Sequence, residues 1–92
     1  MSEKVMSIFK LAGMTAEKYD QLMKELEAAG ESNEADRAFH AASINEEGLI
    51  AVDVWNSAEA LDKFGQVLMP LLGKVGVTPT PPEVYPVYNL II

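Results

Sequence analysis

The sequence predicts an α+β fold, a ferredoxin-like antiparallel sheet of four strands with two helices on one face. Strand-like and helix-like patterns follow one another in the order β-α-β-β-α-β. Connections that run from strand to strand through a helix are right-handed in nearly all proteins, so both helices should cover the same face. A chain of 92 residues is expected to form a single domain over residues 1–92.

The first half of the chain supplies one strand and one helix. Residues 4–11 are rich in apolar and β-branched side chains, which is typical of a strand. Thr15 is a suitable N-cap for a helix over residues 15–29, and Gly30 follows at the position where helices often end. The apolar stripe of this helix consists of Tyr19, Leu22, Met23 and Leu26. Residues 31–36 are polar and predict a solvated loop.

A hairpin is predicted in the middle of the chain. Residues 37–44 and 49–55 resemble strands, and Asn45 and Gly48 between them supply residue types that favour a turn. Pairing about that turn sets Ile44 opposite Leu49, Ala42 opposite Ala51, His40 opposite Asp53 and Ala38 opposite Trp55.

The last part predicts a second helix and a final strand. Ser57 is the natural N-cap, an apolar stripe follows, and Gly76 ends the helix. Pro70 should kink it, because proline lacks a backbone donor. Residues 83–92 are interpreted as a last strand, and Pro86 should lie at a sheet edge or at a bulge, since it cannot donate to a ladder.

Composition excludes several classes of function. The absence of cysteine removes disulfides, thiolate nucleophiles and cysteine-based metal sites, and it fits a cytoplasmic protein. No signal-like core or stretch of about 20 apolar residues is present. A net charge of −7 repels phosphates and anionic lipids, so neither nucleic acid nor membrane is an expected partner.

Strand alternation predicts a homodimer. We expect the helices to cover the hairpin face formed by Phe39, Ala41, Ser43, Ile50, Val52 and Val54. The opposite face carries Ala38, His40, Ala42, Ile44, Leu49, Ala51, Asp53 and Trp55. That second face, together with residues 90–92, is too apolar for water, and a second copy is the commonest way to cover such a surface.

Several runs carry a resemblance to a known family. They are Phe39-His40, Val52-Asp53-Val54-Trp55-Asn56-Ser57 with Glu59-Ala60 and Phe64, and Val87-Tyr88-Asn89-Leu90. The chain resembles the dimeric α+β barrel superfamily, and within it the small proteins similar to antibiotic-biosynthesis monooxygenases. That superfamily also includes haem degraders, isomerases and stress-related barrels, so the resemblance implies a dimeric barrel and no particular substrate.

His40 and Asp53 are the candidate catalytic residues. Directly paired strand residues lie close together, and a carboxylate beside an imidazole orients it for work as a general base or for holding an acidic substrate oxygen. The alternative is a buried polar pair that satisfies itself and fixes the strand register. One histidine and one aspartate supply too few ligands for a metal site, so no metal is expected.

Four further residues are candidates for ligand binding. Trp55 shares a face with Asp53, and the resemblance implies that a strand tryptophan holds a polyaromatic substrate; its alternative role is an anchor in the dimer interface. In the last strand Tyr85 and Asn89 lie on one face and Tyr88 on the other, so at most one of the two tyrosines faces the interior. Tyr85, Tyr88 or Asn89 could contribute a hydroxyl or an amide there, and the alternative is ordinary amphipathic packing. The second helix has no histidine to bind haem, and no cofactor is expected.

Two functions remain open from the sequence. The first is a cofactor-independent monooxygenase that acts on a small aromatic compound, with His40 as base and Asp53 as its orienting partner. The alternative is a non-catalytic module that binds a small apolar ligand or has a stress-related interaction role. In either case we expect a cavity on the helix-free face, bordered by His40, Asp53 and Trp55 and left open by the small Ala38, Ala42 and Ala51.

Overall fold

The computed structural model describes residues 3–30 and 36–92 and confirms the predicted order of elements. The elements are β1 (Val5–Ala12), α1 (Ala16–Ala28), β2 (Arg37–Asn45), β3 (Gly48–Trp55), α2 (Ala58–Lys74) and β4 (Glu83–Pro86). The four strands form one antiparallel sheet in the order β2-β3-β1-β4. The predicted loop at 31–36 lies, except for Asp36, outside the described residues.

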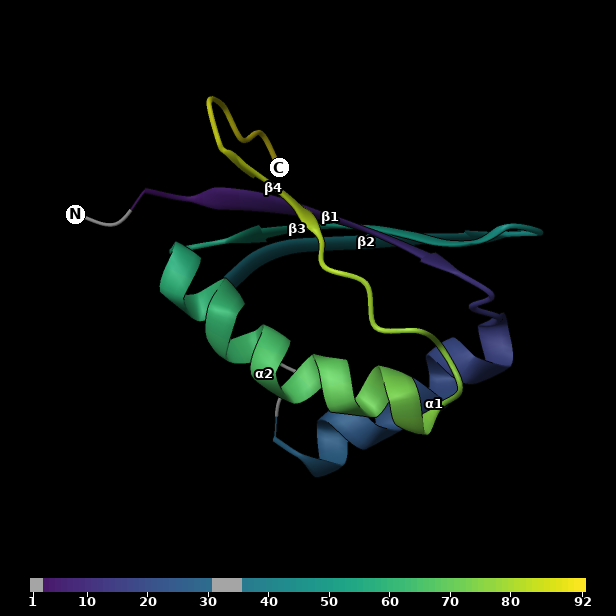
Figure 1. The fold of residues 1–92 in the computed structure, drawn as a ribbon. Coiled ribbons are helices and arrows are strands. Elements are labelled where there is room, and N and C mark those ends of the chain that lie inside the picture. The colour runs from purple at the N-terminus through teal and green to yellow at the C-terminus, as the bar shows by residue number, and fades with distance from the viewer. Residues whose placement is uncertain (1–2, 31–35) are drawn as a thin grey trace.

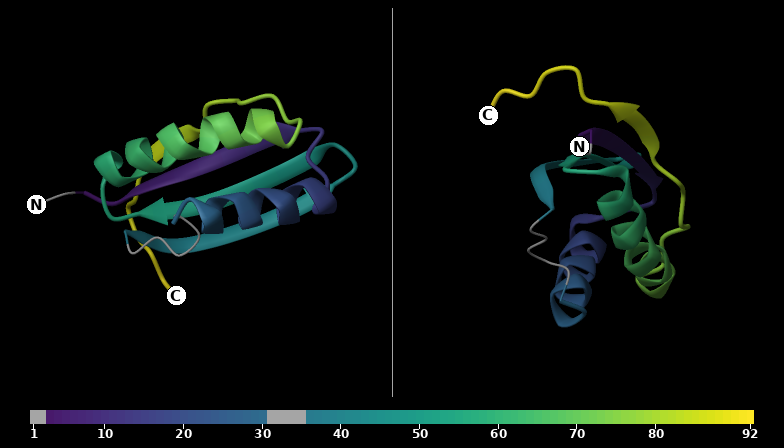
Figure 2. Two further views of the ribbon diagram at one scale, coloured as in Figure 1. Left: turned by 90° about the horizontal axis from the view of Figure 1, so that it is seen from below. Right: turned by 90° about the vertical axis from the view of Figure 1, so that its left-hand side faces the viewer.

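The helices form a second layer on one face of this sheet (Figure 1). In Figure 2, α1 lies on the side of β2, and α2 lies on the side of β1 and β4. This is the ferredoxin-like arrangement that the sequence predicts. Within the described ranges, neither helix combines the length and the apolar character needed to cross a bilayer.

Both helices begin at the predicted caps. The Thr15 hydroxyl accepts a hydrogen bond from the backbone N–H of Lys18 at 3.2 Å, and the Ser57 hydroxyl accepts one from Ala60 at 3.1 Å. α2 continues through Pro70 to its end at Lys74 and is one continuous helix in Figure 2. The proline therefore removes one backbone donor without ending the helix.

The core lies between the helices and the sheet face that the sequence analysis assigned to the dimer interface. Leu49, Ala51, Asp53 and Trp55 are buried beneath the helices, whereas Phe39 and Ile50 are 38% and 42% exposed. The predicted assignment of the two hairpin faces is therefore wrong and must be exchanged. We call the helix-free face the open face; its residues are Met6, Ile8, Phe39, Ala41, Ile50, Val52 and Val54.

Packing against β1 explains why the faces are exchanged. Both hairpin faces are apolar, so alternation within the hairpin alone cannot choose between them. In the sheet, β1 places Phe9 opposite Ala51 and Leu11 opposite Leu49. Phe9 and Ala51 belong to one buried cluster with the leucines of both helices, so the face that β1 shares with the hairpin at these positions is the buried one.

The hairpin register is confirmed except at its open end. Ile44, Ala42 and His40 pair with their predicted partners. The expected pair of Ala38 and Trp55 is wrong, because the strand is irregular between Arg37 and Phe39 and Arg37 takes the position opposite Trp55. Such a bulge inserts one extra residue into one strand of the pair.

The last strand is shorter than predicted. β4 ends at Pro86, opposite Val5, the first residue of β1. One more backbone hydrogen bond follows, from Val87 to the carbonyl of Lys4 at 3.0 Å, and beyond it β1 offers no further partner. Pro86 does lie on an edge strand, as predicted, but residues 87–92 leave the strand and pass over the open face (Figure 1).

Candidate functional site

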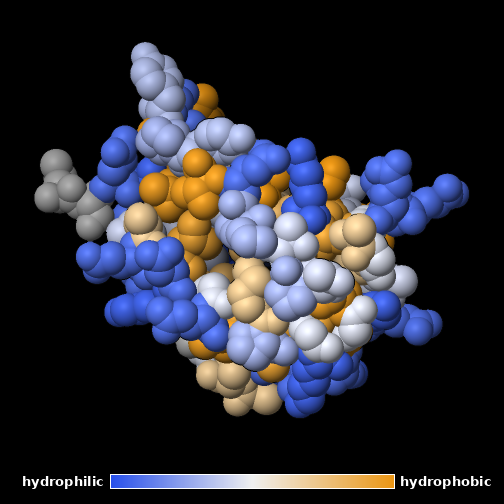
Figure 3. Space-filling model, in the orientation of Figure 1, coloured by the Kyte–Doolittle hydropathy of each residue, from blue (hydrophilic) through white to orange (hydrophobic). Residues whose placement is uncertain are grey.

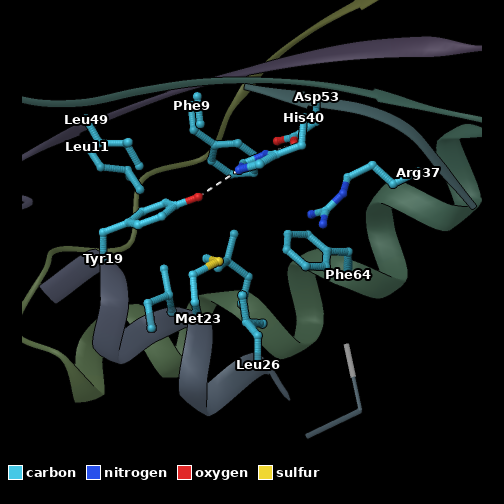
Figure 4. A pocket seen from close by; sticks show the side chains of 13 residues that line it. Phe9, Leu11, Tyr19, Met23, Leu26, Arg37, His40, Leu49, Asp53 and Phe64 are labelled. Carbon is cyan, nitrogen blue, oxygen red and sulfur yellow. Dashed lines mark hydrogen bonds and ion pairs between the residues drawn. The ribbon is translucent and has the colours of Figure 1, made fainter. Parts of the chain in front are cut away.

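A chain of three polar side chains joins the sheet to α1. Asp53 in β3 and His40 in β2 are directly paired and face the helices. His40 Nδ1 is hydrogen-bonded to the Asp53 carboxylate, and the Tyr19 hydroxyl lies 2.8 Å from His40 Nε2. Figure 4 shows Tyr19 reaching toward His40 from α1. The predicted pairing of His40 with Asp53 is confirmed, and Tyr19 extends it to a third group.

The hydrogen bonds determine which nitrogen of His40 carries the proton. A carboxylate only accepts, so Nδ1–H donates to Asp53. Nε2 of the neutral ring then accepts the O–H of Tyr19. Asp53 thereby fixes both the orientation and the tautomer of the imidazole, and it leaves Nε2, the nitrogen nearer the helices, as the basic atom.

Burial and charge keep Tyr19 neutral. The Asp53 side chain is 4% exposed and that of His40 27%. Burial raises the pKa of the Tyr19 hydroxyl above its ordinary value of 10.0, and the negative charge of Asp53 raises it further. The positive charge of Arg37 acts in the opposite direction on the same pKa. The tyrosine therefore holds its proton well above neutral pH.

A cavity of about 30 Å³ adjoins this chain. Its apolar wall includes Phe9, Leu11, Leu22, Met23, Ala51 and Phe64. The expected position on the helix-free face is wrong, because the cavity lies between the helices and the sheet. Of the three alanines predicted to leave space, Ala51 lines it and Ala38 and Ala42 do not. A water needs roughly 10–15 Å³ of such space, so the cavity accommodates water and not an aromatic ring.

Trp55 lies behind the cavity and not in its wall. Its side chain is fully buried, and its indole N–H donates to the Ser7 hydroxyl at 3.3 Å. The indole ring packs on Phe64 with 4.9 Å between ring centroids. Because Trp55 points toward α2, it is not on the open face where a dimer anchor would be needed.

Arg37 is a residue of the site that the sequence analysis did not identify. Its side chain lines the same cavity as His40 and Asp53. The guanidinium carbon lies 5.6 Å from the centroid of the Trp55 ring and 5.7 Å from that of Phe64. The bulge that places Arg37 here has no signature in the sequence. Tyr19 was predicted as part of an apolar stripe, and its hydroxyl was the available signal of a polar role.

The remaining predicted ligand residues lie away from this site. Tyr85 is about half exposed, and its hydroxyl donates to the Glu83 carboxylate at 3.1 Å. Tyr88 and Asn89 border a separate cavity of about 470 Å³ between the tail at 87–91 and the open face. The structure does not bring these three residues together with His40 and Asp53.

Neither a metal centre among the described residues nor a matching known protein identifies this site. Among the described residues, no group of three or more histidine, aspartate or glutamate side chains is placed to hold a metal ion. Searches against protein-family models, curated proteins and solved structures find no match to this chain. The fold and the site therefore define a ferredoxin-like α+β protein with a tyrosine–histidine–aspartate chain beside a small apolar cavity.

Proposed function

We propose that this protein binds a small aromatic compound between its helices and its sheet and removes a proton from it, as a cofactor-independent monooxygenase does. The observation that carries the proposal is the chain from Tyr19 through His40 to the buried Asp53, which ends at an apolar cavity. A base oriented by a buried carboxylate and placed beside apolar walls is the arrangement that general base catalysis needs.

The proton moves along this chain in two coupled transfers. The Tyr19 hydroxyl donates to His40, so its oxygen lone pairs remain available to a substrate hydroxyl or acidic C–H. As the substrate proton passes to the tyrosine oxygen, the tyrosine proton passes to Nε2. The imidazolium that results is held by the Asp53 carboxylate, and the substrate is left as an anion.

Molecular oxygen then reacts with that anion without a cofactor. For a substrate with an activated methylene group, one O₂ converts CH₂ to C=O and releases one water, so the substrate is oxidised and both oxygen atoms are accounted for. The resemblance of the sequence to antibiotic-biosynthesis monooxygenases supports this class of reaction. The protein supplies the base and an apolar wall beside it.

Substrate entry requires side chains to move. The cavity of about 30 Å³ lies beneath Tyr19 and Met23, which are both half-buried residues of α1. Met23 is flexible and adapts readily to a new neighbour. Rotation of these two side chains would enlarge the cavity on the side of α1.

The small cavity favours a second candidate function. A stress-related interaction module needs no preformed cavity, and a protein that binds a ligand without turning it over needs no catalytic base. In that case the polar chain stabilises the β2–β3 register and attaches α1 to the sheet. This candidate predicts that removal of His40 lowers stability and leaves no activity to lose.

The open face supports a homodimer within either function. Phe39 and Ile50 are more than one third exposed on it, and Tyr88, Ile91 and Ile92 of the adjoining tail are almost fully exposed. An apolar surface of this kind is usually covered in solution. Two copies that stack their open faces would bury it and complete a dimeric α+β barrel, with the two His40 sites on the outer, helix-covered sides.

Oxygen uptake tests the proposed function. The wild-type protein should accelerate O₂ consumption by 1,8-dihydroxyanthrone, which has an activated methylene group, and His40→Ala should return the rate to that of buffer. Lys63→Ala, at an exposed position on α2, is the matched control. Equal rates for wild type and His40→Ala would exclude the proposed base, and binding without oxygen uptake would select the second candidate.

A further inference from the structure

We infer that Arg37 makes this pocket selective for aromatic compounds that carry a carboxylate. The inference rests on the proposed ligand-binding function and names the chemical class of its ligand. It is carried by the position of one cation, which the bulge at the start of β2 directs into the site.

A bulge in β2 places Arg37 on the helix-covered face. In a regular strand, the residue two before His40 on the same face is Ala38. The irregularity between Arg37 and Phe39 instead sets Arg37 opposite Trp55, on the face that the helices cover. Bulges frequently lie beside active sites, where they change the direction of a side chain. Here the effect is to replace a methyl group by a guanidinium at the cavity.

The guanidinium of Arg37 lies among aromatic rings. Arg37 is partly buried and lies over the rings of Trp55 and Phe64. It forms no ion pair within residues 3–30 and 36–92. The nearest carboxylate in the cavity wall, that of Asp53, is hydrogen-bonded to His40. The donors of Arg37 are therefore not occupied by an acidic side chain of the described structure.

No lysine lines this cavity. Among the residues that line the cavity, Arg37 is the only lysine or arginine. Lys10 and Lys74 are paired with glutamates on the surface. Lys18 donates to backbone carbonyls of Gly13 and Gly76. With a net charge of −7, the protein repels anions in general, so the attraction of an anion to this cavity depends on Arg37.

The planar guanidinium and the apolar wall together favour a ligand that is both aromatic and acidic. The planar guanidinium presents paired N–H donors that match the two oxygens of a carboxylate. The apolar wall, which includes Phe9, Leu22 and Phe64, suits the aromatic part of the same molecule. Figure 4 shows Arg37 and Tyr19 on opposite sides of His40, so a hydroxyl near the carboxylate of the ligand would lie toward Tyr19.

Calorimetric titration with two matched probes tests the inference. The probes are 1-hydroxy-2-naphthoate and its neutral amide, 1-hydroxy-2-naphthamide. Wild type should bind the carboxylate about tenfold or more tightly than the amide, since hydrogen bonds to charged groups contribute that much. Arg37→Gln should remove the preference for the carboxylate over the amide, and Arg37→Lys should retain only part of it. Lys63→Gln changes the net charge equally at an exposed site and should keep the full preference.

Each outcome has a distinct meaning. Equal affinity of wild type for the two probes, or a preference that survives in Arg37→Gln, would overturn the role of Arg37 while ligand binding stands. Binding of neither probe to wild type would overturn this inference, whereas the proposed function stands or falls with the oxygen-uptake experiment. The comparison of the two probes on wild type needs no variant, so it decides the question even where Arg37→Gln does not fold.

Discussion

Asp53 and His40 lie directly opposite each other in the β2–β3 ladder, and the carboxylate of the first accepts the Nδ1–H of the second. Asp53 is buried and His40 is partly exposed, so the pair links the core to the edge of the site. Because β3 is an inner strand and β2 an edge strand, the sheet holds the carboxylate firmly and presents the imidazole to the cavity.

The first prediction concerns Asp53→Asn. An amide can accept at its oxygen and donate at its nitrogen, so it no longer enforces the Nδ1–H tautomer of His40. The oxygen uptake defined above should fall by roughly 100-fold or more, which is the usual contribution of a general base. Near-ultraviolet circular dichroism should show the fold retained. A variant with normal activity would show that the carboxylate does not orient a catalytic histidine.

The second prediction concerns the titration of Tyr19. Burial and Asp53 raise the pKa of its hydroxyl, so the folded state favours the neutral form. Its contribution to stability is present below pH 10.0, the ordinary pKa, and is lost as pH rises through the raised value. Absorbance titration of the native protein should show a tyrosine that ionises late, and Tyr19→Phe should remove it.

Tyr85 must be separated from Tyr19 in this titration. The pKa of Tyr85 is also raised, through its hydrogen bond to Glu83, so Tyr85→Phe is needed to separate the two late titrations. A Tyr19→Phe protein with the same late component as wild type would contradict the proposed environment of Tyr19.

The third prediction concerns the buried pair of Ser7 and Trp55. Ser7→Ala leaves the indole N–H of Trp55 without its acceptor, and an unsatisfied buried donor costs about 1–3 kcal/mol. Denaturant unfolding should report this loss. In a Trp55→Phe background the donor is absent, so Ser7→Ala should then cost clearly less. The same cost in both backgrounds would show that the hydrogen bond does not contribute.

The sequence predicted the local features of this fold better than its long-range ones. The caps at Thr15 and Ser57, the turn at Asn45 and the His40–Asp53 pair all follow from residue types within a few positions. The choice of buried face does not follow from residue types within a few positions, because it depends on how Phe9 of β1 packs beside Ala51.

The site was predicted only in part for the same reason. His40 and Asp53 belong to one hairpin, so their contact follows from its register. Tyr19 reaches them from α1, and its approach depends on how that helix packs on the sheet. Arg37 enters through a bulge that strand alternation cannot foresee. Tyr88 and Asn89 were placed in a strand that ends earlier, where β1 no longer provides a pairing partner.

The fourth prediction separates the two faces of the sheet by charge. Ile50 is 42% exposed on the open face and lies opposite Lys10, whereas Ala51 is 4% exposed and lies opposite Phe9. A glutamate at position 50 meets a lysine and water in the monomer, but it would be buried between two stacked sheets. A glutamate at position 51 is buried in the core of each protomer, where an unpaired charge costs several kcal/mol.

Sedimentation and thermal unfolding measure the two effects. Wild type should sediment at twice the chain mass of 10.0 kDa, Ile50→Glu should sediment as a folded monomer, and Ala51→Glu should lose cooperative unfolding. The exchange of faces is what distinguishes these variants, because strand alternation alone placed Ala51 on the dimer face and Ile50 beneath the helices. A wild-type monomer at micromolar concentration would rule out the dimer. An Ile50→Glu dimer would instead show that the copies associate through a surface other than the open face.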